Sequence, residues 1–186
     1  MITSKEFDRE IKKIIKKGGV GVIPTDTLYG LVGSALQEEA VERIYALKKR
    51  QSRKPLIVLI SSATELKKFG ISVDESTKKI LRTVWPGPTS VILPVFGVKW
   101  RYLDRGEGSI AFRVPNIPAL RKFLADVGPL VAPSANPEAS EPARNISEAK
   151  KYFGDSVDFY FEGRKLFGKA SSLISIKNGA IKVIRA

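Results

Sequence analysis

Hydroxyl groups surround a single carboxylate directly after a short apolar stretch near the start of the chain. The apolar stretch is VGVIP at 20–24, and the segment PTDTLYG at 24–30 then places Thr25, Thr27 and Tyr29 around Asp26. Ligands of α/β proteins usually sit beyond the carboxyl ends of strands, which makes this segment a candidate binding site for a small polar molecule. The alternative is an ordinary turn in which Asp26 accepts hydrogen bonds from loop amides.

A dense basic cluster follows a predicted helix, in the segment KKRQSRKP at 48–55. It holds five cations in seven positions, namely Lys48, Lys49, Arg50, Arg53 and Lys54. Cations at the end of a helix interact favourably with its dipole, so a solvated helix terminus is one interpretation. The other is a clamp on a triphosphate, because Arg and Lys donate charge-assisted hydrogen bonds to phosphate oxygens.

A third candidate is Arg113, within the predicted strand of SIAFRVP at 109–115. Alternation of side chains places Ser109 and Arg113 on one face of that strand, opposite Ile110, Phe112 and Val114. A guanidinium in a strand this apolar needs an anionic partner, because an unpaired buried charge is costly. That partner is either a carboxylate of the protein or a carboxylate or phosphate of a ligand.

The loop APSANP at 132–137 places Ser134 and Asn136 between two prolines. Prolines restrict the backbone, so these polar groups are held in place at low entropic cost, which favours a binding role. By contrast, WPGP at 85–88 is interpreted as a rigid turn with a mainly structural role.

The segment GRKLFGKASS at 163–172 nearly matches the phosphate-binding loop of nucleoside triphosphatases. Ala170 replaces the hydroxyl residue that holds magnesium in that pattern, and the following SLISI predicts a strand where a helix is required. A triphosphatase of this type is therefore disfavoured. Ser171 and Ser172 remain candidates for lining a pocket.

Composition limits the chemistry that these residues can perform. The chain of 186 residues has no histidine and no cysteine, which excludes Ser-His-Asp and Cys-His catalysis and thiolate zinc sites. Its 32 basic and 19 acidic residues give a net charge of +13, which indicates either polyanionic partners or a generic basic surface. The sequence contains no apolar run long enough to cross a membrane and no secretory signal, so we expect a cytoplasmic protein.

Alternating strands and helices must position these segments, and the end of the chain is purely β. Strands are expected at 20–24, 55–60, 90–95, 109–114, 129–134 and 157–161, followed by a hairpin with Asn178–Gly179 at its turn. Helices are expected before Gly18 and at 38–50, 74–84, 118–126 and 147–153, with a short one opened by Ser62 and Glu65. The pattern predicts a single α/β domain over residues 1–186, with a twisted mixed sheet and flanking helices.

Taken in order, five of these segments resemble one protein family. PTDTLYGL, KKRQSRKPLIVLI, VWPGPTSVIL, AFRVP and APSAN occur at the distances seen in the YrdC-like threonylcarbamoyl-AMP synthases, and the similarity extends from about residue 10 to Arg185. The resemblance implies a YrdC-like α/β domain with a large, positively charged cleft. It also implies an L-threonylcarbamoyladenylate synthase, a nucleotidyltransferase that converts L-threonine, bicarbonate and ATP into threonylcarbamoyl-AMP and pyrophosphate. That product feeds the threonylcarbamoyladenosine modification of tRNA.

The resemblance assigns roles to the matching residues of this sequence. Lys48 and Arg50 match a basic pair that acts on the nucleotide, and they are the expected catalytic residues. The expected threonine-side residues are Thr27, Arg113, Ala132 and Ser171, and the expected nucleotide-side residues are Arg50, Lys54, Ser109, Ser134, Asn136 and Arg185. ATP is a substrate, and Mg²⁺ is expected to be held through its phosphates, without a metal ligand from the protein.

Some positions depart from the family pattern. Leu59 stands where many members have a histidine near threonine, Gln51 replaces a common proline, and Ala170 replaces a frequent glutamate. The loop after Asn136 is one residue longer, so its ATP contact is not transferred to Ala143.

The main rival function is a non-catalytic RNA-binding module that grips phosphates with the basic cluster. The sequence contains neither an aromatic RNA-recognition signature nor the GxxG-centred pattern of a KH domain, which weighs against that function. The two functions are compatible, because the product must be passed to a threonylcarbamoyl transferase that acts on tRNA. We therefore expect that machinery among the partners, with tRNA as a further candidate and no membrane.

Overall fold

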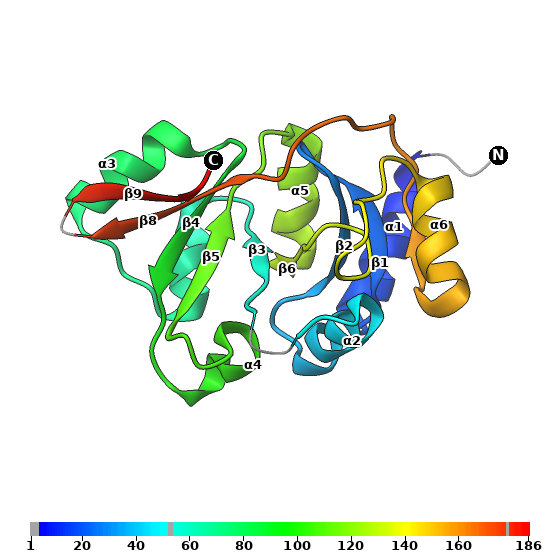
Figure 1. The fold of residues 1–186 in the computed structure, drawn as a ribbon, viewed down its shortest axis with the longest axis horizontal. Helices are drawn as coiled ribbons and strands as arrows, with labels where there is room; N and C mark the ends of the chain where they lie inside the picture. Colours follow the sequence, from blue (N-terminus) through cyan, green and yellow to red (C-terminus); the bar gives the residue numbers. More distant parts are fainter. Residues whose placement is uncertain (1–3, 52–53, 178) are drawn as a thin grey trace.

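The strands of the computed structural model form one mixed sheet flanked by helices (Figure 1). The structure describes residues 4–51, 54–177 and 179–186, and within these ranges the strand order is β7-β1-β2-β6-β3-β5-β4-β8-β9. The strands are β1 (Gly21–Pro24), β2 (Tyr29–Ser34), β3 (Ile57–Leu59), β4 (Thr89–Pro94), β5 (Ser109–Arg113), β6 (Leu130–Val131), β7 (Phe159–Tyr160), β8 (Ser172–Lys177) and β9 (Ala180–Arg185). The predicted α/β class with a mixed sheet is confirmed.

The helices connect and cover these strands. The α-helices are α1 (Ser4–Lys16), α2 (Glu38–Lys48), α3 (Glu75–Val84), α4 (Arg101–Asp104), α5 (Pro118–Val127) and α6 (Ile146–Phe153). Three short 3₁₀ helices within the described ranges are η1 (Ala63–Phe69), η2 (Val98–Trp100) and η3 (Gly154–Ser156). The segment opened by Ser62 and Glu65 is therefore 3₁₀ rather than α-helical, and the helical residues 98–104 were not predicted.

Strand pairing brings distant segments side by side in the middle of the sheet. β3 lies parallel to β5, with Ile57 opposite Ala111 and Leu59 opposite Arg113. β4 lies antiparallel to β5, with Ile92 opposite Ala111, and parallel to β8. Ala111 therefore occupies the middle of a row that crosses three strands.

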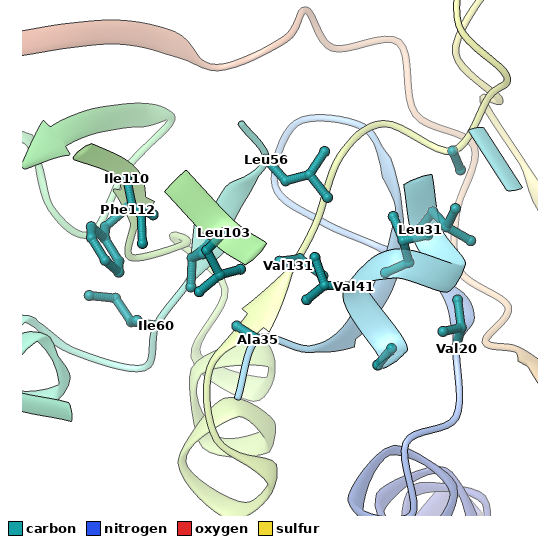
Figure 2. Close-up of a cluster of buried hydrophobic side chains, with 14 of the residues drawn as sticks. Val20, Leu31, Ala35, Val41, Leu56, Ile60, Leu103, Ile110, Phe112 and Val131 are labelled. Atoms are coloured by element: carbon teal, nitrogen blue, oxygen red, sulfur yellow. The ribbon is translucent and has the colours of Figure 1, made fainter. Parts of the chain in front are cut away.

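The two faces of the sheet carry separate apolar clusters, because side chains alternate along each strand. One cluster packs α1 and α5 onto the sheet and includes Ile15, Ile23, Val32, Leu59 and Leu124. The larger cluster lies on the opposite face and includes Val20, Leu31, Val41, Ile60, Phe112 and Val131, as Figure 2 shows. Removing these side chains from water is the main favourable contribution to folding.

Helix α2 packs closely on β2 and ends where the basic cluster begins. The contact occurs at Gly33, where an added side chain would meet the Cδ1 atom of Ile44 at 3.2 Å. The helix ends at Lys48, and not at residue 50 as predicted, because Lys49 adopts a left-handed conformation with φ of 50°. Lys48 is only 2% exposed, so the basic cluster starts on a buried face of the helix.

Strand β2 was not predicted, since its sequence YGLVGS contains two glycines, which are poor strand formers. It pairs antiparallel with β1, so the polar segment at 24–30 is the turn of a hairpin. The predicted strand at 129–134 is shorter than expected, as β6 ends at Val131. β8 and β9 form the predicted antiparallel hairpin, although Asn178 of its turn lies outside the described residues.

Candidate active site

One cavity collects most of the predicted site residues. Its volume is about 380 Å³, and its floor is the row of Ile57, Ala111 and Ile92, on the part of the sheet face beside the α1–α5 cluster. Nine of the predicted residues line it: Thr27, Lys48, Arg50, Ser109, Arg113, Ala132, Ser134, Ser171 and Arg185. They come from segments spread over most of the chain, and β-strand pairing brings them together.

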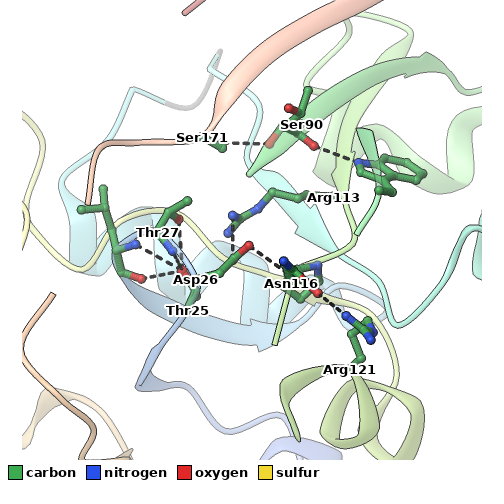
Figure 3. A network of polar contacts seen from close by, with 12 residues as sticks. Thr25, Asp26, Thr27, Ser90, Arg113, Asn116, Arg121 and Ser171 are labelled. Atoms are coloured by element: carbon green, nitrogen blue, oxygen red, sulfur yellow. Dashed lines mark hydrogen bonds and ion pairs between the residues drawn. The ribbon is translucent and has the colours of Figure 1, made fainter. Parts of the chain in front are cut away.

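Arg113 reaches the cavity from the end of β5 and forms an ion pair with Asp26. Its Nη1 lies 2.9 Å from the Asp26 carboxylate, and both side chains are buried, at 4% and 10% exposure (Figure 3). The second carboxylate oxygen accepts a hydrogen bond from the backbone N–H of Asn116. The protein itself therefore supplies a partner for the buried guanidinium. Burial lowers the pKa of Arg113, and the charge of Asp26 opposes that shift.

One donor of Arg113 has no partner in this structure. Its Nε is buried and has no hydrogen-bond partner among the described residues. A buried donor without a partner is costly, so its retention beside a cavity favours an anionic ligand. The two alternatives for Arg113 are thus not exclusive: Asp26 takes one side of the guanidinium and leaves another donor without a partner.

The turn that follows β1 is organised by a threonine and not by its aspartate. The Thr25 hydroxyl accepts hydrogen bonds from the N–H groups of Thr27 and Leu28 and donates to the Leu28 carbonyl at 2.7 Å. The hydroxyls of Thr25 and Thr27 lie 3.1 Å apart and are buried. These contacts fix Thr27 at the edge of the cavity and free Asp26 to face Arg113. The sequence prediction placed Asp26 in a candidate binding segment, or in a turn as an acceptor for loop amides, and did not identify Arg113 as its partner.

Lys48 connects the basic cluster to the loop that follows β6. Its Nζ donates hydrogen bonds of 2.6 Å each to the backbone carbonyls of Ser134 and Asn136. Burial, together with the nearby charge of Arg50, lowers the pKa of Lys48 to about 8, while Glu138 acts in the opposite direction. Lys48 therefore holds the Ser134 loop in place and adds positive charge to the cavity wall.

Glu138 also holds the basic segment in place through hydrogen bonds. Its carboxylate accepts hydrogen bonds from the Nζ of Lys54 at 2.7 Å and from the N–H of Gln51 at 3.0 Å. The backbone N–H of Glu138 donates to the carbonyl of Lys48 at 2.7 Å. Arg50 bends back onto the same segment, since its Nε donates to the carbonyl of Lys54 at 3.2 Å. Arg53 of the basic cluster lies outside the described residues.

Two predicted residues, Lys54 and Asn136, do not line the cavity. Lys54 is directed to Glu138. The side-chain amide of Asn136 donates to the carbonyls of Pro137 and Ser140 and thereby fixes the turn of its own loop. Their nucleotide contacts stay predictions, whereas their contacts in this structure position the segments that carry Lys48 and Ser134.

The C-terminal hairpin contributes Arg185, and Ser171 immediately precedes its first strand. The Ser171 hydroxyl is buried and lies 2.9 Å from the hydroxyl of Ser90 on β4 (Figure 3). Arg185 donates from Nε and Nη2 to the carbonyl of Ser171, at 3.2 and 2.7 Å. These bonds hold an exposed arginine over the cavity mouth.

The segment resembling a phosphate-binding loop has a different structural role. No helix follows it within the described residues, because Ser172–Lys177 forms strand β8. Its glycines allow a close crossing over the 24–30 turn: a side chain at Gly168 would meet the Thr27 carbonyl oxygen at 2.4 Å, and one at Gly163 would meet Pro24 at 2.6 Å. The buried Tyr29 hydroxyl donates to the Arg164 carbonyl and accepts from the Gly163 N–H. A triphosphatase loop is excluded by this geometry.

The positions that depart from the family pattern fall in different environments. Leu59 is completely buried in the apolar cluster of α1 and α5 and does not line the cavity. Ala143 is also buried and lies in the opposite cluster. Ala170 lines the cavity, as does Glu107, the single carboxylate residue in the described lining. Glu107 lies in an exposed turn before β5, where no sequence signal marks it.

The described residues contain neither a metal-binding cluster nor a membrane-spanning helix. Among them there is no group of three or more His, Cys, Asp or Glu side chains that could hold a metal ion. In the same ranges no helix is long and apolar enough to span a membrane.

An α/β protein with cations and hydroxyls converging on one cavity is a protein built to bind small anions. The family model described as "Telomere recombination" (Sua5, YciO and YrdC) matches residues 13–186, and the chain belongs to this family. A threonylcarbamoyl-AMP synthase of Hahella chejuensis is 33% identical over 178 residues, which cover 94% of this chain and 96% of the relative. A putative threonylcarbamoyl-AMP synthase of Methanocaldococcus jannaschii is 32% identical over 177 residues, with 94% and 83% covered.

Solved structures show the same fold. P. abyssi Sua5 in complex with L-threonine superposes with a TM-score of 0.88 at 28% identity over 96% of this chain. The chain spans about half of that protein, 53% of its length. E. coli YciO gives a TM-score of 0.86 at 25% identity, with 98% of this chain and 89% of YciO covered.

Proposed function

We propose that this chain is an L-threonylcarbamoyladenylate synthase, which forms threonylcarbamoyl-AMP and pyrophosphate from L-threonine, bicarbonate and ATP. The observation that carries the proposal is the convergence of Lys48, Arg50, Arg113 and Arg185 on one cavity that also exposes hydroxyls. Threonylcarbamoyl-AMP synthases similar over most of this chain support the same reaction. Residues 1–186 are proposed to act as one domain, in the cytoplasm.

The proposed reaction needs no group that titrates near neutral pH. Bicarbonate takes up a proton and releases water to give CO₂. The neutral threonine amine attacks this CO₂ and loses a proton, which leaves a carbamate anion. A carbamate oxygen then bonds to the α-phosphorus of ATP as the bond to the leaving pyrophosphate breaks. A chain without histidine can promote these steps, because they require alignment of anions and stabilisation of charge on phosphate oxygens.

The residues that line the cavity are divided between the two substrates as the family resemblance implies. The guanidinium of Arg113 is proposed to bind the threonine carboxylate, with Thr27, Ser171 and the backbone of Ala132 also on the threonine side. Lys48, Arg50 and Arg185 are proposed to bind the triphosphate, with Ser109 and Ser134. Magnesium bound to the phosphates would neutralise charge on the leaving pyrophosphate.

The direct test supplies the three substrates singly and together and measures pyrophosphate. The proposal expects release only when ATP, L-threonine and bicarbonate are all present, with threonylcarbamoyl-AMP as the second product. Release from ATP alone, indifferent to threonine, would refute it. The product is an activated acyl donor, so we propose that a threonylcarbamoyl transferase acting on tRNA consumes it.

A further inference from the structure

A second cavity lies beyond the end of β5, apart from the proposed active site. Its volume is about 690 Å³, and it is bounded by η1, α3, the residue that follows β5 and one residue of α5. The two linings share no residue: Arg113 at the end of β5 lines the first cavity, and the next residue, Val114, lines the second. A volume of this size falls within the range of about 300–1,000 Å³ that small-molecule sites occupy.

The charged residues of this second cavity are all basic. Lys67 of η1, Lys78 and Arg82 of α3 and Arg121 of α5 line it, and the described lining includes no Asp or Glu. Lys78 is paired with Glu75 at 2.6 Å, and Arg121 donates to the carbonyl of Pro115 at 3.2 Å. Among the described residues neither Lys67 nor Arg82 forms an ion pair; both residues are exposed, and the charge of Arg82 acts on the nearby Glu75. Two cations are therefore available to a ligand.

The remaining lining combines hydroxyls with an apolar floor. Ser62 and Thr64 lie at the start of η1, with their hydroxyls 2.7 Å apart. Leu81, Val114 and the ring of Trp85 form the apolar part, and Trp85 is fixed by a hydrogen bond of 2.8 Å from its indole N–H to the Thr89 carbonyl. Lysine, arginine and hydroxyl donors together match phosphate oxygens, and an apolar surface beside them suits a base.

We propose that this second cavity is a binding site for a small organic phosphate of the nucleoside monophosphate class, separate from the proposed active site. The phosphate lies between Lys67 and Arg82, and the apolar part of the ligand lies against Trp85. The inference is independent of the proposed reaction, because none of these residues lines the first cavity.

The two tryptophans of the chain provide a local test. Both are buried, but only Trp85 lines the second cavity, and Trp100 packs with its ring 4.8 Å from that of Phe69. In the full chain labelled with 5-fluorotryptophan, titration with AMP is expected to shift the ¹⁹F signal of Trp85 saturably and to leave that of Trp100 in place. Adenosine and inorganic phosphate, used as separate probes, are each expected to bind at least about tenfold more weakly than AMP.

Variants decide whether the signal comes from this cavity. The double variant Lys67→Ala, Arg82→Ala is expected to weaken AMP binding about tenfold or more, the loss expected for two charge-assisted hydrogen bonds. Lys79→Ala removes an exposed cation from the same helix and is expected to change nothing. Arg50→Ala, which alters the first cavity, is expected to leave the Trp85 titration unchanged.

Three results would overturn the proposal. The first is a Trp85 signal that does not respond to AMP. The second is a response that survives in the Lys67→Ala, Arg82→Ala variant but disappears in Arg50→Ala, which would place the nucleotide in the first cavity only. The third is equal affinity for inorganic phosphate and AMP, which would leave no role for the apolar floor.

Discussion

The Arg113 guanidinium and the Asp26 carboxylate lie 2.9 Å apart, although the two residues are 87 positions apart in the sequence. The pair joins the end of β5 to the turn between β1 and β2, and both segments supply residues to the cavity wall. The ion pair thus sets where the unpartnered Nε of Arg113 lies. The position of the proposed threonine site depends on a carboxylate that does not itself line the cavity.

Asp26→Asn is expected to lower both stability and threonine affinity. Removing one member of a buried ion pair costs about 3–5 kcal/mol, because the remaining charge stays buried without its partner. Thermal unfolding of the variant measures the first effect, and the KM for threonine, expected to rise about tenfold or more, measures the second.

The matched control for Asp26 is Asp126→Asn, which breaks an ion pair with Lys12 at the surface. Its unfolding temperature and its KM for threonine should match those of the unchanged chain, since exposed pairs contribute little. If Asp26→Asn behaves like this control, the pair does not position the site.

Affinity for ATP is expected to fall as the pH rises through about 8, where Lys48 loses its proton in the free protein. A bound triphosphate favours the charged ammonium, so binding raises the pKa of Lys48 and takes up a proton above that pH. Calorimetric titrations of ATP between pH 7 and pH 10 measure this effect. The variant Lys48→Met should remove this part of the pH dependence, and an unchanged slope would contradict the assignment.

The same shift has a defined sign for stability. The pKa of Lys48 is about 8 in the folded chain and 10.5 when the side chain is not buried, as in the unfolded chain. Between these two pH values the unfolded chain therefore binds more protons than the folded chain. The contribution of Lys48 to the free energy of unfolding therefore rises as the pH increases from 8 to 10.5. The difference between the unchanged chain and Lys48→Met, measured by urea unfolding across this range, isolates the effect.

Arg50→Ala and Lys48→Ala are each expected to reduce pyrophosphate formation by at least about 100-fold, the loss typical of a missing transition-state contact. Lys151→Ala, which removes an exposed cation of α6, serves as the control and should retain full activity. Near-native rates for both cavity variants would show that the basic pair does not act on the triphosphate.

Glu138→Gln tests whether the hydrogen bonds that Glu138 accepts from the basic segment position Arg50. The carboxylate is held ionised, because hydrogen bonds from Lys54 and from the Gln51 N–H lower the pKa of Glu138. Losing that charge should raise the KM for ATP about two- to fivefold and leave the KM for threonine unchanged, since the ion pair with Lys54 is partly exposed. Glu138→Asp, which keeps the charge, is expected to restore part of the affinity. An equal rise in the KM for ATP and in the KM for threonine would indicate that the substitution disturbs the whole cavity and not the position of Arg50.

Local sequence patterns predicted most of the elements but missed those that depend on close packing. α5 covers Pro118–Val127 where a helix at 118–126 was predicted, because proline at its first turn and apolar periodicity mark it clearly. Strand β2 was missed because its glycines weaken the strand pattern, and the reason for Gly33 is visible only once α2 lies against it.

For the site, the sequence predicted which segments converge but not how their side chains pair. Arg113 was recognised as a buried cation, whereas Asp26 could be identified as its partner only from the pairing of strands. The burial of Lys48 could not be predicted from the sequence either, because a helix end rich in cations is usually solvated. Here the helix ends at Lys48, and Lys49 follows it in a left-handed conformation. The glycines at 163 and 168 matched a phosphate-loop pattern for a reason unrelated to phosphate.

The methyl side chain of Ala111 lies on the cavity floor, between Ile57 and Ile92. Heavy atoms added at this position would project into the cavity in which we propose that the substrates bind. The smallest side chain of the row therefore leaves room above the floor, and exchanging it for valine is expected to exclude larger molecules before smaller ones.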